Sequence, residues 1–345
     1  METVTSRDGT PIAYERSGEG PPLVLVHGTT SDHSTWELVR PQLQKRFTVY
    51  AMDRRGRGES GGGGGSAYNI EREFEDVIAI IDSIDGPVDL FGHSYGAICV
   101  LEAALRSSQV RGLVLYEGTL PVPKGTRLYP PEALDRVRAA LKTGDREGAL
   151  TTFYRDIVLM SPEEIEMLRS LPLWPARVAL APTIPYEMRA FESYTLAFDP
   201  AKVSNLRTPT LLLLGGDSPA IEKAAAETLN AALPDSRIVV MPGQAHLAHR
   251  TAPELFAREV VQFLQAQGAS EASHVVDTKK EGSDEPERPS PRGNRTGRTD
   301  SAGTRGLERM ALVDPVRRAT RPRAEGDPGP APKRRAGRGR RTLPG

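Results

Sequence analysis

Short apolar runs recur along residues 1–270 and alternate with stretches of helical periodicity. Leu23–Val26 is a continuous apolar run, which is typical of a strand buried on both faces of a sheet. Ile70–Ile84 and Pro253–Gln265 carry apolar residues three or four positions apart, which predicts helices. This alternation predicts a mostly parallel sheet with helices on both faces. The other expected strands are Pro11–Arg16, Phe47–Met52, Val88–Phe91, Leu113–Tyr116, Thr210–Leu214 and Arg237–Met241.

The alternation stops between about Leu120 and Asn205. This stretch contains helix-like segments separated by proline-containing joints, and no convincing strand. We therefore interpret residues 120–205 as a helical cap inserted between two strands. The α/β core then consists of residues 1–119 and 206–268.

The C-terminal segment, residues 269–345, differs in composition from the rest of the chain. From Glu271 to Gly345 there are 18 Lys and Arg residues against 11 Asp and Glu, although the whole chain has no net formal charge. The segment is rich in Arg, Pro and Gly and has no aromatic residue, so we expect it to be disordered. Its basic end, Lys333–Arg341, raises the hypothesis of nucleic-acid binding. We favour a solvated tail, because charge alone gives weak, salt-sensitive binding.

The cysteine and hydropathy content exclude several protein classes. A single cysteine, Cys99, rules out an internal disulfide framework and a cysteine-based zinc site, and it suits a reducing cytoplasm. No run approaches the roughly 18 apolar residues of a membrane helix. Residues 1–10 lack the basic-then-apolar pattern of a signal peptide. We therefore expect a cytoplasmic protein without membrane attachment.

The sequence Gly92-His-Ser-Tyr-Gly96 lies directly after an expected strand and directly before a helix. A turn from strand straight into helix forces its central residue, Ser94, into strained dihedral angles. It also leaves little room for side chains two positions to either side, which explains Gly92 and Gly96. The pattern predicts that Ser94 is an exposed nucleophile at the edge of the sheet.

A serine hydroxyl needs an adjacent base, and histidine is the usual one. The chain has six histidines: His27, His33, His93, His246, His249 and His274. The loop after the last expected strand carries two of them. We favour His246 as the base, because Gly243 provides a turn before it, whereas His249 fits the start or cap of the next helix.

The third group should be a carboxylate that orients the histidine. Asp217 follows the expected strand Thr210–Leu214 and precedes His246 along the chain, so we prefer it. Glu117, just after the strand Leu113–Tyr116, is the alternative that stays open. Either carboxylate would equally suit a loop or helix-capping role.

An oxyanion formed by attack on a carbonyl needs backbone donors. Gly28 follows the strand Leu23–Val26 and allows the chain to turn back over the site, with the amide of Thr29 directed inward. The second expected donor is the amide of Tyr95, the residue after the nucleophile. It also lies at the positive end of the following helix dipole.

The motifs HGTT, DRRGRGES, GHSYG, GGDSP and PGQAH, in this order over about residues 10–266, resemble the α/β-hydrolase superfamily. The resemblance implies an eight-stranded mostly parallel sheet and a cap after the sixth strand. It also implies a triad of Ser94, His246 and an acid, with no cofactor and no metal. One departure is that Gly215-Gly216-Asp217 is shorter than the spacing in many members, which keeps Glu117 open.

The resemblance implies a serine hydrolase that acts on an ester-type carbonyl of a small-molecule substrate through an acyl-enzyme. Hydrolysis of C–C bonds or lactones, cofactor-free perhydrolysis, and a non-enzymatic ligand-binding receptor remain alternatives on the same scaffold. Aromatic residues of the cap are candidates to line the acyl pocket, namely Trp174, Tyr186, Phe191 and Tyr194.

Overall fold

The computed structural model describes residues 1–63, 68–118, 120 and 127–281, with side chains up to residue 268. Its centre is one sheet with the strand order β1-β2-β4-β3-β5-β6-β7-β8. β1 and β2 pair antiparallel with their neighbours, and the pairs from β4 to β8 are parallel. The strands are β1 (Glu2–Thr5), β2 (Pro11–Ser17), β3 (Pro22–Val26), β4 (Thr48–Met52), β5 (Val88–His93), β6 (Val110–Tyr116), β7 (Thr210–Gly215) and β8 (Ser236–Met241).

This architecture confirms the predicted mostly parallel, eight-stranded sheet, and each of the seven strands located by its apolar pattern is present. The strand that the pattern missed is β1, whose sequence ETVT is polar and largely exposed. β1 forms the sheet edge and pairs only with β2. An exposed edge strand needs no continuous apolar run, so periodicity gives no signal for it.

Helices cover both faces because side chains alternate across each strand. Leu23 and Leu25 pack on one face with α1 (Arg40–Leu43) and α11 (Pro253–Glu281). Val24 and Val26 pack on the other face against helices α2 (Ile70–Asp82), α3 (Tyr95–Ala104) and α9 (Ala220–Ala232). Two further short helices, η1 (His33–Trp36) and α10 (Ala248–Thr251), lie near the ends of β3 and β8.

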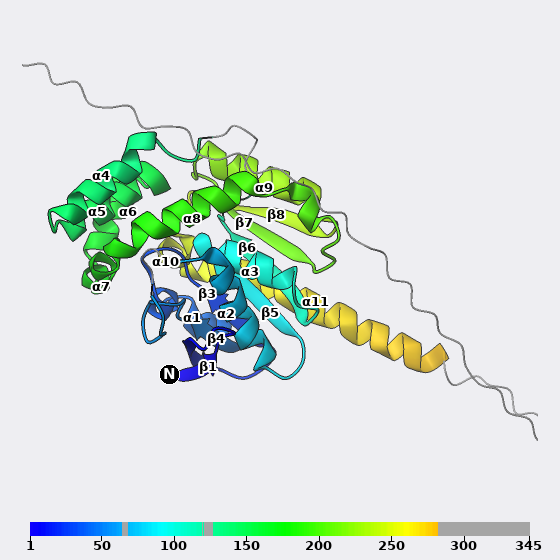
Figure 1. The fold of residues 1–345 in the computed structure, drawn as a ribbon. Helices are drawn as coiled ribbons and strands as arrows, with labels where there is room; N and C mark the ends of the chain where they lie inside the picture. Colours follow the sequence, from blue (N-terminus) through cyan, green and yellow to red (C-terminus); the bar gives the residue numbers. More distant parts are fainter. Residues whose placement is uncertain (64–67, 119, 121–126, 282–345) are drawn as a thin grey trace, which may run out of the picture. The chain divides into compact units, whose positions relative to one another are not determined.

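The described residues between β6 and β7 fold as helices, which gather at one end of the sheet in Figure 1. They are compatible with the predicted cap, of which residues 121–126 lie outside the described part. These helices are α4 (Pro131–Lys142), α5 (Arg146–Phe153), η2 (Tyr154–Val158), α6 (Pro162–Arg169), α7 (Trp174–Ala179), η3 (Ala181–Thr183), α8 (Ile184–Ala197) and η4 (Pro200–Val203).

The expectation of disorder from residue 269 onward is wrong for residues 269–281, because α11 continues to Glu281. That stretch contains good helix formers such as Ala, Glu and Lys and no proline, so nothing in it ends the helix. The chain divides into two units, Met1–Glu285 and Pro286–Gly345. The second unit, with the basic cluster Lys333–Arg341, lies outside the described residues.

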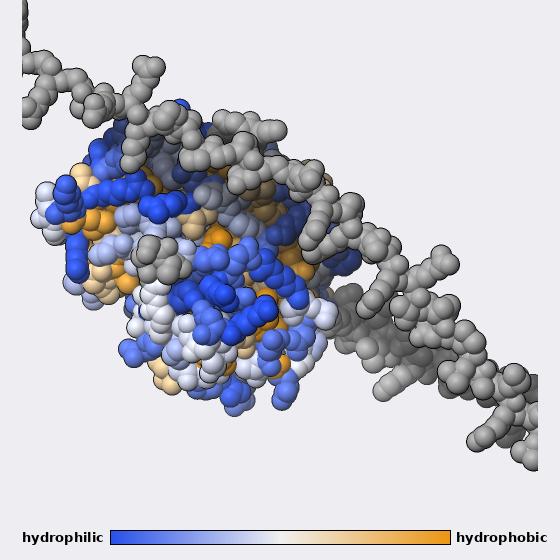
Figure 2. Space-filling model, in the orientation of Figure 1, coloured by the Kyte–Doolittle hydropathy of each residue, from blue (hydrophilic) through white to orange (hydrophobic). Residues whose placement is uncertain are grey.

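The surface is mixed in character, and Figure 2 shows one face on which hydrophilic residues dominate and hydrophobic residues form small groups. Large hydrophobic residues that are exposed in the described part include Met1, Leu38, Leu159, Leu196 and Val240. They are spread over different elements, as is normal for a protein surface. Among the described helices, none combines the length and the hydropathy required to cross a bilayer.

A buried cluster of charges joins the cap to the core. Arg54, after β4, donates two hydrogen bonds to Glu73 on α2, at 2.9 and 2.7 Å. It donates a third, at 2.6 Å, to Glu187 on α8, which also pairs with Arg57 at 2.7 Å. All four side chains are buried. Charges removed from water in this way depend on one another for compensation.

This dependence predicts that the charge of Glu187 stabilises the fold. Glu187→Gln leaves two buried guanidinium groups short of one negative charge. We expect it to lower the free energy of unfolding by about 3–5 kcal/mol, measured by urea denaturation. Glu166→Gln is the control, because Glu166 forms an exposed pair with Arg169, and its loss should change stability by less than about 1 kcal/mol. Equal effects of the two substitutions would contradict this account.

Candidate active site

Ser94 occupies a strained turn between β5 and α3. Its φ of 54° and ψ of −123° lie outside the regions that non-glycine residues favour. A Cβ on Gly92 would lie 2.4 Å from the carbonyl oxygen of Gly96, and a Cβ on Gly96 would lie 2.2 Å from that of Val26. The chain therefore folds here as the sequence predicted, with glycines flanking a serine between strand and helix.

His246 lies in the loop after β8 and contacts Glu117. Its Nδ1 donates a hydrogen bond to Oε2 of Glu117 over 2.8 Å. The other carboxylate oxygen accepts hydrogen bonds from the backbone N–H of Gly215, at 2.7 Å, and from the hydroxyl of Ser218. Glu117 directly follows β6, is buried and has a φ of 49°. With Nδ1 protonated in this way, Nε2 is the histidine nitrogen left to accept a proton.

The preference for Asp217 as the partner of His246 is wrong, and the alternative Glu117 makes that contact. Asp217 is exposed, and its backbone N–H donates to the carbonyl oxygen of Gln244 at 2.9 Å. The loop after β7 thus donates hydrogen bonds to Glu117 and does not supply the carboxylate itself. The short Gly215-Gly216 spacing was the signal in the sequence that pointed to this outcome.

The environment of His246 has opposing effects on its pKa. Burial lowers the pKa, but the hydrogen bond and the charge of Glu117 raise it, and the net result lies above the ordinary value of 6.5. Burial, together with the nearby imidazoles of His246 and His249, holds the pKa of His93 well below that value. His246 is therefore the histidine here that gains a proton most readily, as a general base requires.

Two residues that the sequence analysis gave no role hold the His246 loop in place. His93 Nε2 donates to the backbone carbonyl of His246 at 3.0 Å. The Tyr116 hydroxyl donates to the carbonyl oxygen of Ala245 and accepts from the N–H of Ala248 at 3.0 Å. Both come from strand ends, one residue before Ser94 and Glu117 respectively. That adjacency was the available signal for a positioning role.

A cavity with about 580 Å³ of empty volume lies beside Ser94 and His246. Thr29 and Tyr95, the predicted oxyanion donors, line it as well. The amide of Tyr95 is in the first turn of α3, where N–H groups have no partner within the helix. A Cβ on Gly28 would approach the Ser94 Cβ to 3.0 Å, which accounts for glycine at that position. The apolar wall includes Leu128, Phe153, Ile157, Met188 and Phe191.

Of the four cap aromatics considered as pocket residues, Phe191 lines this cavity. The others pack elsewhere: Trp174 packs against Tyr154, Tyr186 packs against Tyr68, and the Tyr194 hydroxyl donates to Glu102. Three of these four aromatics thus serve as packing residues. The sequence alone does not separate the two uses, because both place aromatic residues at helical spacing.

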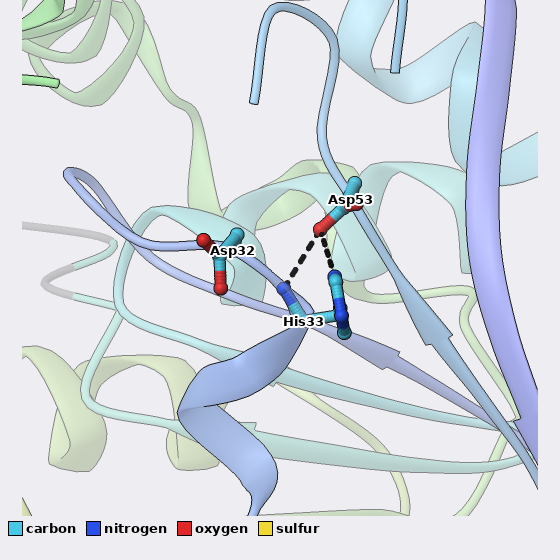
Figure 3. Close-up of side chains that lie close together, drawn as sticks. All are labelled: Asp32, His33 and Asp53. Atoms are coloured by element: carbon cyan, nitrogen blue, oxygen red, sulfur yellow. Dashed lines mark hydrogen bonds and ion pairs between the residues drawn. The ribbon is translucent and has the colours of Figure 1, made fainter. Parts of the chain in front are cut away.

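Asp32, His33 and Asp53 form a close group whose ligand types suit a metal ion (Figure 3). However, one oxygen of Asp53 already accepts hydrogen bonds from the backbone N–H and the Nδ1 of His33, each at 2.8 Å. Its other oxygen accepts from the N–H of Glu59 at 3.0 Å. Asp32 caps η1 by accepting from the N–H of Ser34. These bonds explain the group as a brace between two loops.

A sequence model of the alpha/beta hydrolase family matches residues 23–259, from β3 to α11. The chain belongs to this family. The match includes the strand ends that carry Ser94 and Glu117 and the loop that carries His246. Membership makes the protein an alpha/beta hydrolase by fold and by class of activity.

Known hydrolases resemble this alpha/beta hydrolase over most of their length. The 2-(acetamidomethylene)succinate hydrolase of Mesorhizobium japonicum is 27% identical over 266 residues, which are 74% of this chain and 92% of the relative. The pimeloyl-(acyl-carrier protein) methyl ester esterase of Aeromonas hydrophila is 24% identical over 260 residues, 73% of this chain and 99% of the relative. The crystal structure of an alpha/beta hydrolase from Sphaerobacter thermophilus is 37% identical, has a TM-score of 0.67, and covers 76% of this chain and 100% of its own.

The contact between Glu117 and His246 predicts how the imidazole titrates in this hydrolase. Glu117→Gln removes the charge that raises the pKa of His246, so the midpoint of its titration should move to lower pH. The control Asp217→Asn changes an exposed carboxylate, for which the described part of the chain shows no hydrogen bond or ion pair with His246, and it should leave the midpoint where it is. NMR titration of the His246 ring protons measures both. A shift with Asp217→Asn and none with Glu117→Gln would contradict the assignment.

Proposed function

We propose that the protein is a serine hydrolase that cleaves an ester-type carbonyl bond of a small molecule through an acyl-enzyme. The observation that carries the proposal is the convergence of Ser94, His246 and Glu117. The strained serine and the carboxylate-bound imidazole line one cavity, although they lie more than a hundred positions apart in the chain. Packing alone gives no reason for a serine at φ 54° beside a buried His–Glu pair.

In the first half of the reaction, the Ser94 Oγ attacks the substrate carbonyl while Nε2 of His246 takes its proton. The negative charge that develops on the carbonyl oxygen is stabilised by the amides of Thr29 and Tyr95. Glu117 stabilises the imidazolium through Nδ1 and keeps the ring oriented. The tetrahedral intermediate then expels the alcohol, which receives the proton from Nε2, and the acyl group stays on Ser94.

The second half repeats these roles with water as the nucleophile. Nε2 of His246 takes a proton from a water molecule, and the resulting hydroxide attacks the acyl carbonyl. The same two amides stabilise the second oxyanion. When it collapses, the bond to Oγ breaks, Ser94 regains its proton from Nε2, and the carboxylic acid leaves. Each turnover consumes one water and needs no cofactor.

Two observations support a carbonyl substrate with an apolar portion. Most residues of the cavity wall are apolar, and the polar ones include Ser94, Thr29, Tyr129, Glu222 and His246. The relatives include one named for methyl ester cleavage and one named for hydrolysis of an acetamido compound. Acyl transfer to a serine serves both bond types, and we propose the ester because its leaving group needs less assistance. A cytoplasmic location stays a prediction.

Ester turnover should depend on the Ser94 hydroxyl. We expect the wild-type protein to hydrolyse p-nitrophenyl acetate or butyrate with sustained turnover, and Ser94→Ala to lower kcat by at least about 1,000-fold. The measurement is the release of nitrophenol, combined with mass spectrometry of the quenched enzyme, which should find the acyl group on Ser94. Ser107→Ala, in the loop after the C-terminal end of α3, is the matched control and should retain wild-type rates. Binding without sustained turnover in the wild type would favour the receptor alternative.

A further inference from the structure

A second cavity, with about 390 Å³ of empty volume, adjoins Ser94 and has a different character. It shares Thr29, Ser94 and His246 with the apolar cavity, so the two flank the same reacting group. Its wall also carries Arg177, from cap helix α7, and His249, from α10. A substrate held at Ser94 can therefore place one portion against apolar residues and another against a cationic wall.

Arg177 is a buried cation whose contacts are all neutral. Its exposed fraction is 7%, and it donates to the Thr30 carbonyl at 3.4 Å and the Tyr154 hydroxyl at 3.1 Å. It also donates to the Thr35 hydroxyl at 3.2 Å. Within the described part of the chain it forms no ion pair, and its Nε has no hydrogen-bond partner. A buried charge without a counter-charge is costly, so this site is complementary to an anion.

His249 provides a second unpartnered group on the same wall. It is 1% exposed, and Nδ1 has no hydrogen-bond partner among the described residues. Its Nε2 lies 3.4 Å from the Thr35 hydroxyl, which accepts a bond from Arg177 and so has its own proton to donate. Burial, together with the charges of Arg177 and Arg250, holds the pKa of His249 well below its usual value. A neutral ring that accepts at Nε2 carries its proton on Nδ1 and offers it as a donor.

No carboxylate side chain appears among the described residues that line this cavity. The other cation nearby, Arg250, is already paired with Glu37 at 2.7 Å. The charge of Arg177 is thus the one without a partner at this wall. A carboxylate is the anion that matches a planar guanidinium best, because its two oxygens can accept parallel N–H bonds.

We propose that this cavity binds a carboxylate group that the substrate carries a few bonds from its scissile carbonyl. Arg177 supplies the charge and His249 a second hydrogen bond, while the apolar cavity holds the remainder of the substrate. The proposal rests on the hydrolase function proposed above and narrows it to anionic esters. It makes Arg177 a specificity-determining residue, whose loss affects charged substrates more than neutral ones.

The test compares pairs of esters that differ by one carboxylate. Monomethyl glutarate and methyl pentanoate place the difference in the acyl part, whereas acetoxyacetate and ethyl acetate place it in the alcohol part. For each pair, the ratio of kcat/KM for the anionic ester to that for the neutral ester is measured by acid release at constant pH. We expect a wild-type ratio above 1 in at least one pair. Arg177→Met should lower that ratio about 10- to 100-fold, and Arg177→Lys should retain part of it.

A control separates recognition from a purely structural role of Arg177 in holding the cap. Tyr154→Phe removes one hydrogen-bond acceptor of Arg177 and leaves the charge of Arg177 in place. It should therefore change kcat/KM for the anionic and the neutral ester of a pair by similar factors. If Arg177→Met changes kcat/KM equally for the anionic and the neutral ester, or if the wild type prefers neither anionic ester, the proposal is overturned.

Binding measurements keep this test independent of turnover and of variant folding. Calorimetry with Ser94→Ala should show binding of monomethyl glutarate that exceeds binding of methyl pentanoate, and adding Arg177→Met should abolish the difference. Such binding without ester turnover by the wild type would sustain the subsite and refute the hydrolase function. Ester turnover by the wild type together with equal binding of the two ligands would support the hydrolase function and refute the carboxylate subsite. If Arg177→Met does not fold, the Ser94→Ala comparison and Arg177→Lys still decide the question.

Discussion

The hydrogen bond between His246 and Glu117 connects the parts of the sheet that build the site. Glu117 stands at the end of β6, and His246 arrives from the loop after β8, so the bond spans the end of β7. The end of β7 and the loop after it stabilise this bond. The N–H of Gly215 and the hydroxyl of Ser218 donate hydrogen bonds to the same carboxylate. A buried carboxylate that accepts three hydrogen bonds is held in one orientation. The hydrogen bond in turn orients the ring of His246, which lines the same cavity as Ser94.

Backbone strain is concentrated at the same edge of the sheet. Thr30, Ser94 and Glu117 each have a positive φ, and they follow the neighbouring strands β3, β5 and β6. Such conformations cost about 1–3 kcal/mol each, and they persist only where the surroundings hold them. In this protein, glycines leave room for the turn at Ser94, and hydrogen bonds hold Glu117 in place. The free energy gained by folding the sheet therefore offsets the cost of these strained conformations, which orient the side chains of Ser94 and Glu117 at the site.

The sequence was informative where the signal is local, and it failed where the outcome depends on contacts between distant segments. The strand pattern and the glycine-flanked Ser94 lie within short stretches, so their geometry follows from neighbouring residues. The choice between Asp217 and Glu117 depends on how far β7 and its loop extend beside β6, which no periodicity encodes. The same limit applies to Arg177, because a cap arginine becomes a cavity residue only through packing against the loops after β3 and β8. The polar strand β1 was missed because an exposed edge strand needs no apolar pattern, and the extension of α11 was missed because its composition was taken together with that of the Pro- and Gly-rich residues that follow it.

The central claim is that Ser94, His246 and the two amides act on one carbonyl group, with Glu117 behind the imidazole. A crystal structure of the protein inactivated by an alkyl fluorophosphonate tests this claim directly, since the phosphonyl group imitates the tetrahedral intermediate. We expect phosphorus bonded to Oγ of Ser94, and one phosphonyl oxygen within about 3 Å of the amides of Thr29 and Tyr95. His246 should lie between the adduct and Glu117. Phosphorus on another residue, or an adduct whose oxygen points away from both amides, would contradict the account.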